Sequence, residues 1–218
     1  MMKRLTLLLA ALALSSAVRA DTAPSIRYLA LGDSFTIGTG SSPAEAFPAR
    51  LADRWRAAGR QVELRNLGVN GYTTQDLIDE ELPAAGSFAP TFVTLAIGAN
   101  DLVRGVDAAR YREQLRRIFA LLATAGVSPA RVVALPQPDW SQSPAAAGFG
   151  DPATTAARIR DFNRILREQA TAAGARYVDL FPLMERQARG KLVAGDGLHP
   201  SAKAYGEWAN ALEAERLP

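Results

Sequence analysis

Hydrophobic residues occur along this chain in two patterns, short runs and longer stretches with helical spacing. Residues 62–67 alternate hydrophobic and polar side chains, which predicts a half-exposed strand at the edge of a sheet. Residues 92–97 form a short apolar run, which predicts a strand buried on both faces. Three further short runs predict strands at 27–31, 131–135 and 177–181. The pattern therefore indicates five strands.

Stretches with helical spacing separate these strands. Along 107–123, one face of a helix carries the hydrophobic side chains of Tyr111, Leu115, Ile118, Phe119 and Leu122. Further helices are predicted at 47–58, 74–82 and 155–173, and a C-terminal helix has an inner stripe of Tyr205, Trp208, Ala209 and Leu212. Strands that alternate with helices predict a parallel sheet covered on both faces. We therefore expect an α/β fold, a three-layer α/β/α sandwich with a five-stranded parallel sheet.

The first twenty residues have the pattern of a secretory signal peptide. A short basic start at 1–4 precedes an apolar stretch at 5–18, and Val18-Arg19-Ala20 is a plausible cleavage site. The sequence thus predicts a leader at 1–20, a single domain at 21–218 and export to the periplasm or beyond. No later stretch approaches the roughly 20 apolar residues that a membrane helix needs, so no membrane-spanning segment is expected in the mature chain.

Charge and cysteine content argue against a nucleic-acid-binding protein and against a disulfide-stabilised one. The whole chain has 25 basic and 22 acidic residues, but three of the basic residues lie within 1–20, so the remaining chain is formally neutral. The basic precursor is therefore no indication of nucleic-acid binding. Because the chain has no cysteine, no disulfide framework is available and an ordinary hydrophobic core must stabilise it.

Candidate chemistry follows each of the first three predicted strands. Ligands of open α/β sheets bind beyond the carboxyl ends of the strands. The segments that follow those strands are Gly32-Asp33-Ser34-Phe35, Leu67-Gly68-Val69-Asn70-Gly71 and Gly98-Ala99-Asn100-Asp101. Each combines a glycine with a reactive or hydrogen-bonding side chain, and all three are expected on one rim. The long loop predicted at 136–155 lies at the end of the fourth strand.

The chain contains one histidine, His199, in the segment Asp196-Gly197-Leu198-His199-Pro200. A single histidine excludes a His-rich metal site, and no metal or cofactor is expected. Asp196, three residues earlier, is a suitable partner to hold the imidazole in one tautomer. Because this segment follows the last strand, it can reach the same rim as Ser34 and supply a general base for it.

Taken together, these segments resemble the SGNH or GDSL hydrolase family. Gly32-Asp33-Ser34-Phe35 differs from the family's Gly-Asp-Ser-Leu only in its last residue, and Gly68, Asn100 and the Asp196/His199 pair match the later blocks in order. The resemblance covers residues 28 to 208 and implies a flavodoxin-like hydrolase fold. It implies a catalytic triad of Ser34, Asp196 and His199, with an oxyanion hole formed by the Ser34 N–H, the Gly68 N–H and the Asn100 amide.

Each residue also has a structural alternative. Ser34 can cap the first helix, and Gly68 can provide a turn that needs positive φ. Asn100 can cap the region of Asp107 or close an Asx-turn, and the Asp196–His199 segment can end a loop before a last helix capped by Ser201. Asp33 and Asp101 are interpreted as loop braces that hydrogen-bond rather than react.

Two other fold families that bind or hydrolyse small molecules lack their signatures in this sequence. The ordinary α/β-hydrolase fold requires Gly-x-Ser-x-Gly, and a dinucleotide-binding domain requires Gly-x-Gly-x-x-Gly; the segment after the first strand has neither. The expected substrates are acyl esters of a lipase, arylesterase, lysophospholipase or thioesterase type. A carbohydrate acetylesterase and a non-catalytic binding module on the same scaffold are the alternatives.

Overall fold

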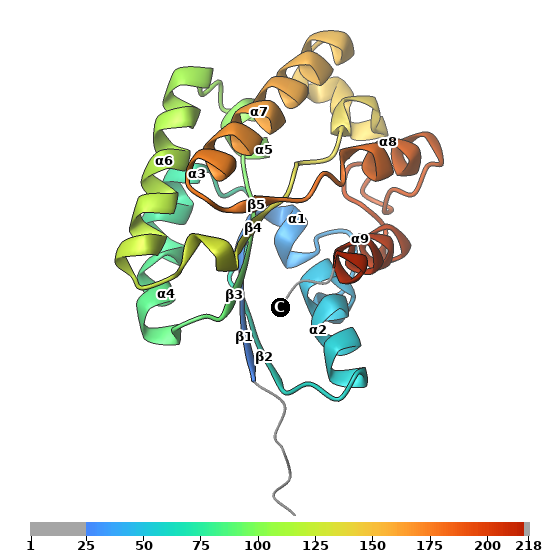
Figure 1. The fold of residues 1–218 in the computed structure, drawn as a ribbon. Coiled ribbons are helices and arrows are strands. Elements are labelled where there is room, and N and C mark those ends of the chain that lie inside the picture. The colour runs from blue at the N-terminus through green and yellow to red at the C-terminus, as the bar shows by residue number, and fades with distance from the viewer. Residues whose placement is uncertain (1–24, 216–218) are drawn as a thin grey trace, which may run out of the picture.

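The computed structural model describes residues 25–215, and the predicted leader at 1–20 lies outside this range. Five parallel strands form one sheet in the order β2-β1-β3-β4-β5 (Figure 1). The strands are β1 (Ile26–Gly32), β2 (Val62–Asn66), β3 (Phe92–Ala96), β4 (Val132–Ala134) and β5 (Arg176–Tyr177). The sheet confirms the predicted α/β fold, with β2 at an edge and β3 fully buried.

Helices cover both faces of the sheet. They are α1 (Ser34–Ile37), α2 (Phe47–Ala57), α3 (Thr74–Asp76), α4 (Pro83–Phe88), α5 (Ala99–Val103), α6 (Ala108–Thr124), α7 (Pro152–Ala172), α8 (Phe181–Arg189) and α9 (Ala202–Ala214). In Figure 1, α2 packs on α9 on one side of the sheet, and α6 packs on α7 on the other. No helix among residues 25–215 is long and apolar enough to cross a membrane.

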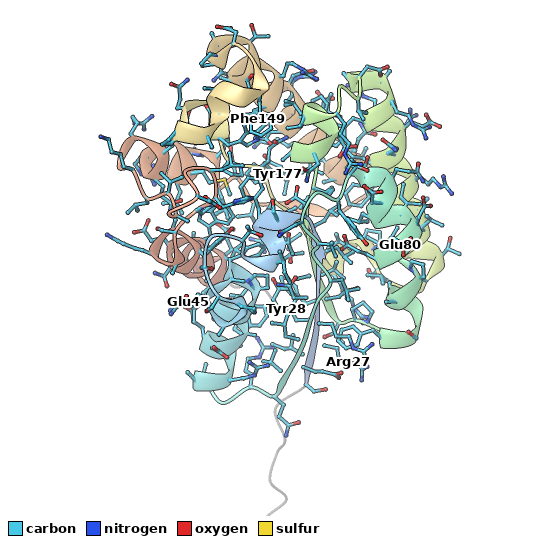
Figure 2. The ribbon with its side chains drawn as sticks, turned by 180° about the vertical axis from the view of Figure 1, so that it is seen from behind. Arg27, Tyr28, Glu45, Glu80, Phe149 and Tyr177 are labelled. Carbon is cyan, nitrogen blue, oxygen red and sulfur yellow. The ribbon has the colours of Figure 1, made fainter. Side chains whose placement is uncertain are left out.

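The core lies between these layers and is rich in aromatic side chains. Tyr28 of β1, labelled in Figure 2, is fully buried. Its ring contacts the rings of Trp55 and Phe92, with centroid distances of 5.7 Å and 5.0 Å. The predicted inner stripe of α9 is buried, and Ser201 caps that helix by accepting from the Ala204 N–H at 3.4 Å. These contacts hold β1, which directly precedes Ser34, and α9, which directly follows the segment of His199.

Two elements differ from their predictions near proline residues. The last strand was expected at 177–181 but ends at Tyr177, and α8 begins at Phe181. Pro182 favours this helix start because its fixed φ suits a first helical turn and its missing N–H is not needed there.

The helix predicted at 74–82 is interrupted by a π-helical turn, Leu77–Glu81, before α4. The Leu82 N–H donates to the Leu77 carbonyl at 3.1 Å, one residue further back than in an α-helix. Pro83 follows at once and has no N–H to continue the regular ladder. This turn buries the side chain of Glu81, which is 2% exposed.

The sheet order places a topological switch point between β1 and β3. From β1 the chain runs to the neighbouring edge strand, and from β3 it runs the other way along the sheet. A crevice forms where such connections diverge, at the carboxyl ends of the strands. The predicted loop at 136–155 lies above β4 and contains two 3-10 turns, Trp140–Gln142 and Pro144–Phe149, before α7 begins at Pro152.

Candidate active site

Ser34 lies at the carboxyl end of β1, in a turn that only glycine permits. Gly32 has φ +149°, and a Cβ added there would lie 2.1 Å from the Ala96 carbonyl oxygen of β3. The cap of α1 is Asp33, whose Oδ1 accepts from the Phe35 N–H at 3.0 Å. Ser34 is the first helical residue, so the capping role considered from the sequence belongs to its neighbour. The side chain of Ser34 therefore has no capping role and can interact with a ligand in the crevice.

His199 and Asp196 form a hydrogen-bonded pair. The His199 Nδ1 lies 2.7 Å from Asp196 Oδ2, while Asp196 Oδ1 accepts from the Leu198 N–H at 2.9 Å and the His199 N–H at 3.0 Å. Partial burial acts to raise the pKa of Asp196, but these hydrogen bonds outweigh it and hold that pKa below its usual range. Asp196 therefore remains an acceptor for the imidazole at neutral pH.

A cavity of about 230 Å³, here called the ester cavity after the substrate class expected from the sequence, brings the predicted residues Ser34, Asn100 and His199 together. Ser34, Asn100 and His199 line it, although they come from segments far apart in the sequence. The ring of Phe35 packs 5.5 Å from the His199 ring and helps to orient it. No hydrogen bond joins Ser34 Oγ to His199 within the described residues.

Apolar side chains form the outer part of the ester cavity. Val103 and Phe149 line it and are 45% and 42% exposed, which makes them two of the three most exposed large hydrophobic residues in the described chain. Figure 2 shows Phe149 on the segment that precedes α7, at the carboxyl end of the sheet. Trp140 packs edge-on against Phe149, with centroids 5.5 Å apart. The mouth of the cavity is therefore suited to an apolar group.

Asn100 lies in α5 directly beyond β3. One hydrogen of its amide binds the Tyr72 carbonyl oxygen at 3.0 Å, which fixes the side chain while it lines the ester cavity. The amide has a second hydrogen, so it can donate to a ligand as well. The predicted loop-brace role of the next residue is confirmed, because Asp101 accepts from the Thr74 N–H at 2.9 Å.

Gly68 does not lie where the resemblance implied. Its N–H donates to Asn66 Oδ1 at 3.1 Å, and Gly68 is not among the residues that line the ester cavity. Its φ is not positive either; a Cβ there would lie 2.8 Å from the Ile37 N and 2.9 Å from the Asp33 carbonyl oxygen. The glycine is thus required for close packing against α1. This position corrects the role expected for the Gly68 N–H.

Gly71, three residues later, does line the ester cavity. It has φ +82°, and its N–H donates to no acceptor among residues 25–215. Its carbonyl oxygen accepts from Arg104 at 2.8 Å, which holds the turn in place. The segment after β2 contains two glycines, and the sequence pattern does not distinguish them. The path of the loop over α1 gives them different surroundings, which is why Gly71 was missed from the sequence.

Two carboxyl groups are buried behind Ser34. Asp33 is 1% exposed and Glu81 is 2% exposed, and Glu81 Oε2 accepts from the Gly32 N–H at 2.9 Å. Asp33 Oδ2 and Glu81 Oε1 are both buried without a hydrogen-bond partner among the described residues. Burial, together with the nearby charge of Asp33, raises the pKa of Glu81 to about 9 in spite of the Gly32 hydrogen bond. No group of three or more potential metal ligands occurs within residues 25–215.

The raised pKa of Glu81 predicts that the free energy of unfolding depends on pH, and that Glu81→Gln removes this contribution. The folded protein holds a proton on Glu81 that the unfolded chain, with a pKa near 4.5, releases. Stability therefore falls as pH rises from about 5 to 9, and the loss in the wild type exceeds that in Glu81→Gln by at least about 1.4 kcal/mol, the value of one pKa unit. Urea unfolding at both pH values measures the difference. Equal losses in the two proteins would contradict the assignment, and the exposed Glu80→Gln is the matched control.

Comparison with known proteins identifies the family. The model of the GDSL-like Lipase/Acylhydrolase family matches residues 30–206. The chain is 32% identical over 114 residues to "Thioesterase 1/protease 1/lysophospholipase L1" of Escherichia coli K12, a match covering 52% of this chain and 50% of that protein. The chain thus spans about half the length of the curated relatives it matches.

Solved structures agree with the fold. A lipase/acylhydrolase from Enterococcus faecalis superposes with a TM-score of 0.71 at 22% identity, over 88% of this chain and 97% of that one. An acetyl xylan esterase from Geobacillus stearothermophilus superposes with a TM-score of 0.69 at 18% identity, over 87% and 94% of the chains. Because the family model covers most of the chain, from β1 to α9, this protein belongs to the GDSL-like lipase/acylhydrolase family.

Proposed function

We propose that this protein hydrolyses carboxylic esters through an acyl-enzyme formed on Ser34. The observation that carries the proposal is the ester cavity itself, in which Ser34 and Asn100 meet a His199 ring held by Asp196. Ser34 Oγ attacks the ester carbonyl carbon while His199 accepts its proton, and Asp196 stabilises the imidazolium. His199 then protonates the departing alcohol or thiol. His199 then accepts a proton from a water molecule that attacks the acyl carbon, the bond between that carbon and Ser34 Oγ breaks, and His199 returns the proton to Ser34 as the carboxylic acid leaves.

Attack on the carbonyl creates a negatively charged oxygen, which needs hydrogen-bond donors already in place. We assign the donors as the Ser34 N–H, the Gly71 N–H and the Asn100 side-chain amide. Gly71 takes the place first expected for Gly68, because the Gly68 N–H is bound to Asn66 and the Gly71 N–H is unbound in the described structure. All three assigned residues line the ester cavity.

Removing the Asn100 amide tests this oxyanion hole. Asn100→Ala is expected to lower kcat by about 10²–10³-fold with a smaller change in KM, because the donor acts mainly on the transition state. Steady-state hydrolysis of 4-nitrophenyl butyrate measures both constants. Asn210→Ala, on the exposed side of α9, is the matched control and keeps the wild-type kcat. A change in KM alone would assign Asn100 to substrate binding rather than to the oxyanion hole.

The apolar mouth of the ester cavity favours acyl esters over acetylated sugars. Val103 and Phe149 expose hydrophobic surface there, which a hydrophobic ester covers and a hydrated sugar does not. Turnover of 4-nitrophenyl acetate and butyrate above the Ser34→Ala background tests the activity. A panel that includes acetylated xylose oligomers tests the substrate class, and strong preference for the sugars would overturn it in favour of a carbohydrate acetylesterase.

We also propose that the protein is exported and that residues 1–20 are removed. The basic, apolar and small-residue order of that segment supports the proposal. Mass analysis of the protein recovered from the periplasm or medium is expected to give an N-terminus at Asp21. An intact N-terminus retained in the cytoplasm would contradict it.

A further inference from the structure

A second cavity adjoins the ester cavity. Its volume is about 300 Å³, and it lies between α8, α9 and the segment 138–144. Trp140 and Leu198 line both cavities, so the two share a boundary. The second cavity is therefore adjacent to the ester cavity, with the side chains of Trp140 and Leu198 at their common boundary.

The chemistry of the second cavity indicates an apolar occupant. Its walls include Trp140, Met184, Leu192, Val193, Leu198 and Trp208. Two of the polar side chains beside them, Gln187 and Ser143, are paired within the protein, and the exposed Arg189 and Lys191 also belong to the polar part of the lining. Gln187 accepts from the Trp208 Nε1 at 2.7 Å and donates to Glu207 at 2.7 Å, and the Ser143 hydroxyl donates to the Trp140 carbonyl at 2.7 Å. A hydrocarbon or aromatic group thus fits this cavity without breaking these hydrogen bonds.

The position of the second cavity distinguishes the two sides of an ester. The shared residue Leu198 directly precedes His199, which lines the ester cavity, whereas Val103 and Phe149 line the ester cavity and not the second one. The leaving group must lie beside the histidine that protonates it. The second cavity is therefore assigned to the leaving-group side of the reacting carbon, next to Leu198, and the apolar mouth at Val103 and Phe149 to the acyl chain.

We propose that the second cavity binds an apolar alcohol, phenol or thiol portion of the ester, so that it sets leaving-group specificity. This inference rests on the proposed ester hydrolysis at Ser34. Trp140 and Leu198 then lie beside the ester bond that joins the acyl group to the leaving group. Burial of the leaving group there favours aromatic and alkyl esters over methyl esters, because more apolar surface leaves water.

The variant that tests this proposal fills the second cavity from α8. Ala188 lines the cavity and is half-buried, and Ala188→Trp places an indole in it. We expect kcat/KM for 2-naphthyl butyrate to fall at least about tenfold, while that for methyl butyrate stays within about twofold. Arg186→Trp, exposed on the same helix and outside this cavity, is the matched control and leaves both values unchanged. Ala188→Leu serves as a milder variant if the larger side chain prevents folding.

An acyl series separates the two sides of the substrate. With 4-nitrophenyl esters from acetate to octanoate, Ala188→Trp is expected to lower all kcat/KM values by the same factor. A loss that grows with acyl length would overturn the proposal and assign the cavity to the acyl chain. Unchanged kinetics for every ester would overturn it as well.

A binding measurement keeps this inference separate from catalysis. The fluorescence of 2-naphthol reports its binding to the protein directly, and we expect Ala188→Trp to weaken that binding while Ser34→Ala leaves it intact. If the wild type binds 2-naphthol in this way but hydrolyses no ester, the proposed function fails. If it hydrolyses esters but Ala188→Trp changes neither binding nor leaving-group preference, only the second-cavity proposal fails.

Discussion

Ser34→Ala is expected to lower kcat for 4-nitrophenyl butyrate on the order of 10⁵–10⁶-fold, as loss of the nucleophile does in serine hydrolases. Among the described residues that line the ester cavity, Ser34 is the only one with a hydroxyl group. No other side chain there can therefore form the acyl-enzyme. The residual rate measures what the oxyanion donors and substrate binding contribute alone.

Structural damage can be separated from loss of the nucleophile. Ser34 Oγ forms no hydrogen bond with the described residues, so Ser34→Ala is expected to unfold at the wild-type urea concentration. Ser87→Ala, exposed on α4, is the matched control for activity. A fluorophosphonate is expected to add its mass to the peptide containing Ser34 in the wild type and not in the variant. Labelling at another serine would remove Ser34 from the mechanism.

His199→Ala is expected to lower kcat by a similar factor, because no other group in the ester cavity can accept the serine proton at neutral pH. The two losses are not additive: Ser34→Ala/His199→Ala is expected to be no slower than either single variant. Stopped-time assays with product detection by chromatography reach the low rates that these variants require.

A histidine base at His199 predicts how kcat/KM depends on pH on the acid side of the optimum. Protonated imidazole cannot accept the Ser34 proton, and histidine is the residue type that ordinarily changes charge between pH 5 and 8. We expect kcat/KM of the wild type to fall at acid pH with the slope of one proton. Since His199 is the sole histidine in the sequence, any imidazole titration reports on it alone. A kcat/KM that does not fall at any acid pH at which the protein stays folded would exclude a histidine base.

The buried carboxyls behind Ser34 show why local sequence is not sufficient for part of the site. Glu81 belongs to a stretch in which Asp79, Glu80 and Glu81 follow one another, and nothing in that run singles out one residue for burial. The π-helical turn turns Glu81 inward to the Gly32 N–H, while Glu80 remains exposed. The additional residue per turn, together with Pro83 directly after it, is what separates Glu81 from its exposed neighbour.

The sequence by itself determined the order and type of the main elements, together with the pairing of Asp196 with His199. Those features depend on side-chain periodicity and on groups three residues apart, which act over short distances along the chain. Ser34, Asn100 and His199 share a rim for an equally general reason, since parallel strands present their carboxyl ends on one side.

Only the tertiary structure decided which glycine faces the ester cavity and what lies beside it. Gly68 packs against α1 and Gly71 lies in the cavity, although both stand in one short segment. The second cavity needs α8, α9 and the segment around Trp140 at once, and these come from distant parts of the chain. The direction of a backbone N–H and the shape of a cavity both follow from long-range packing, which no local pattern encodes.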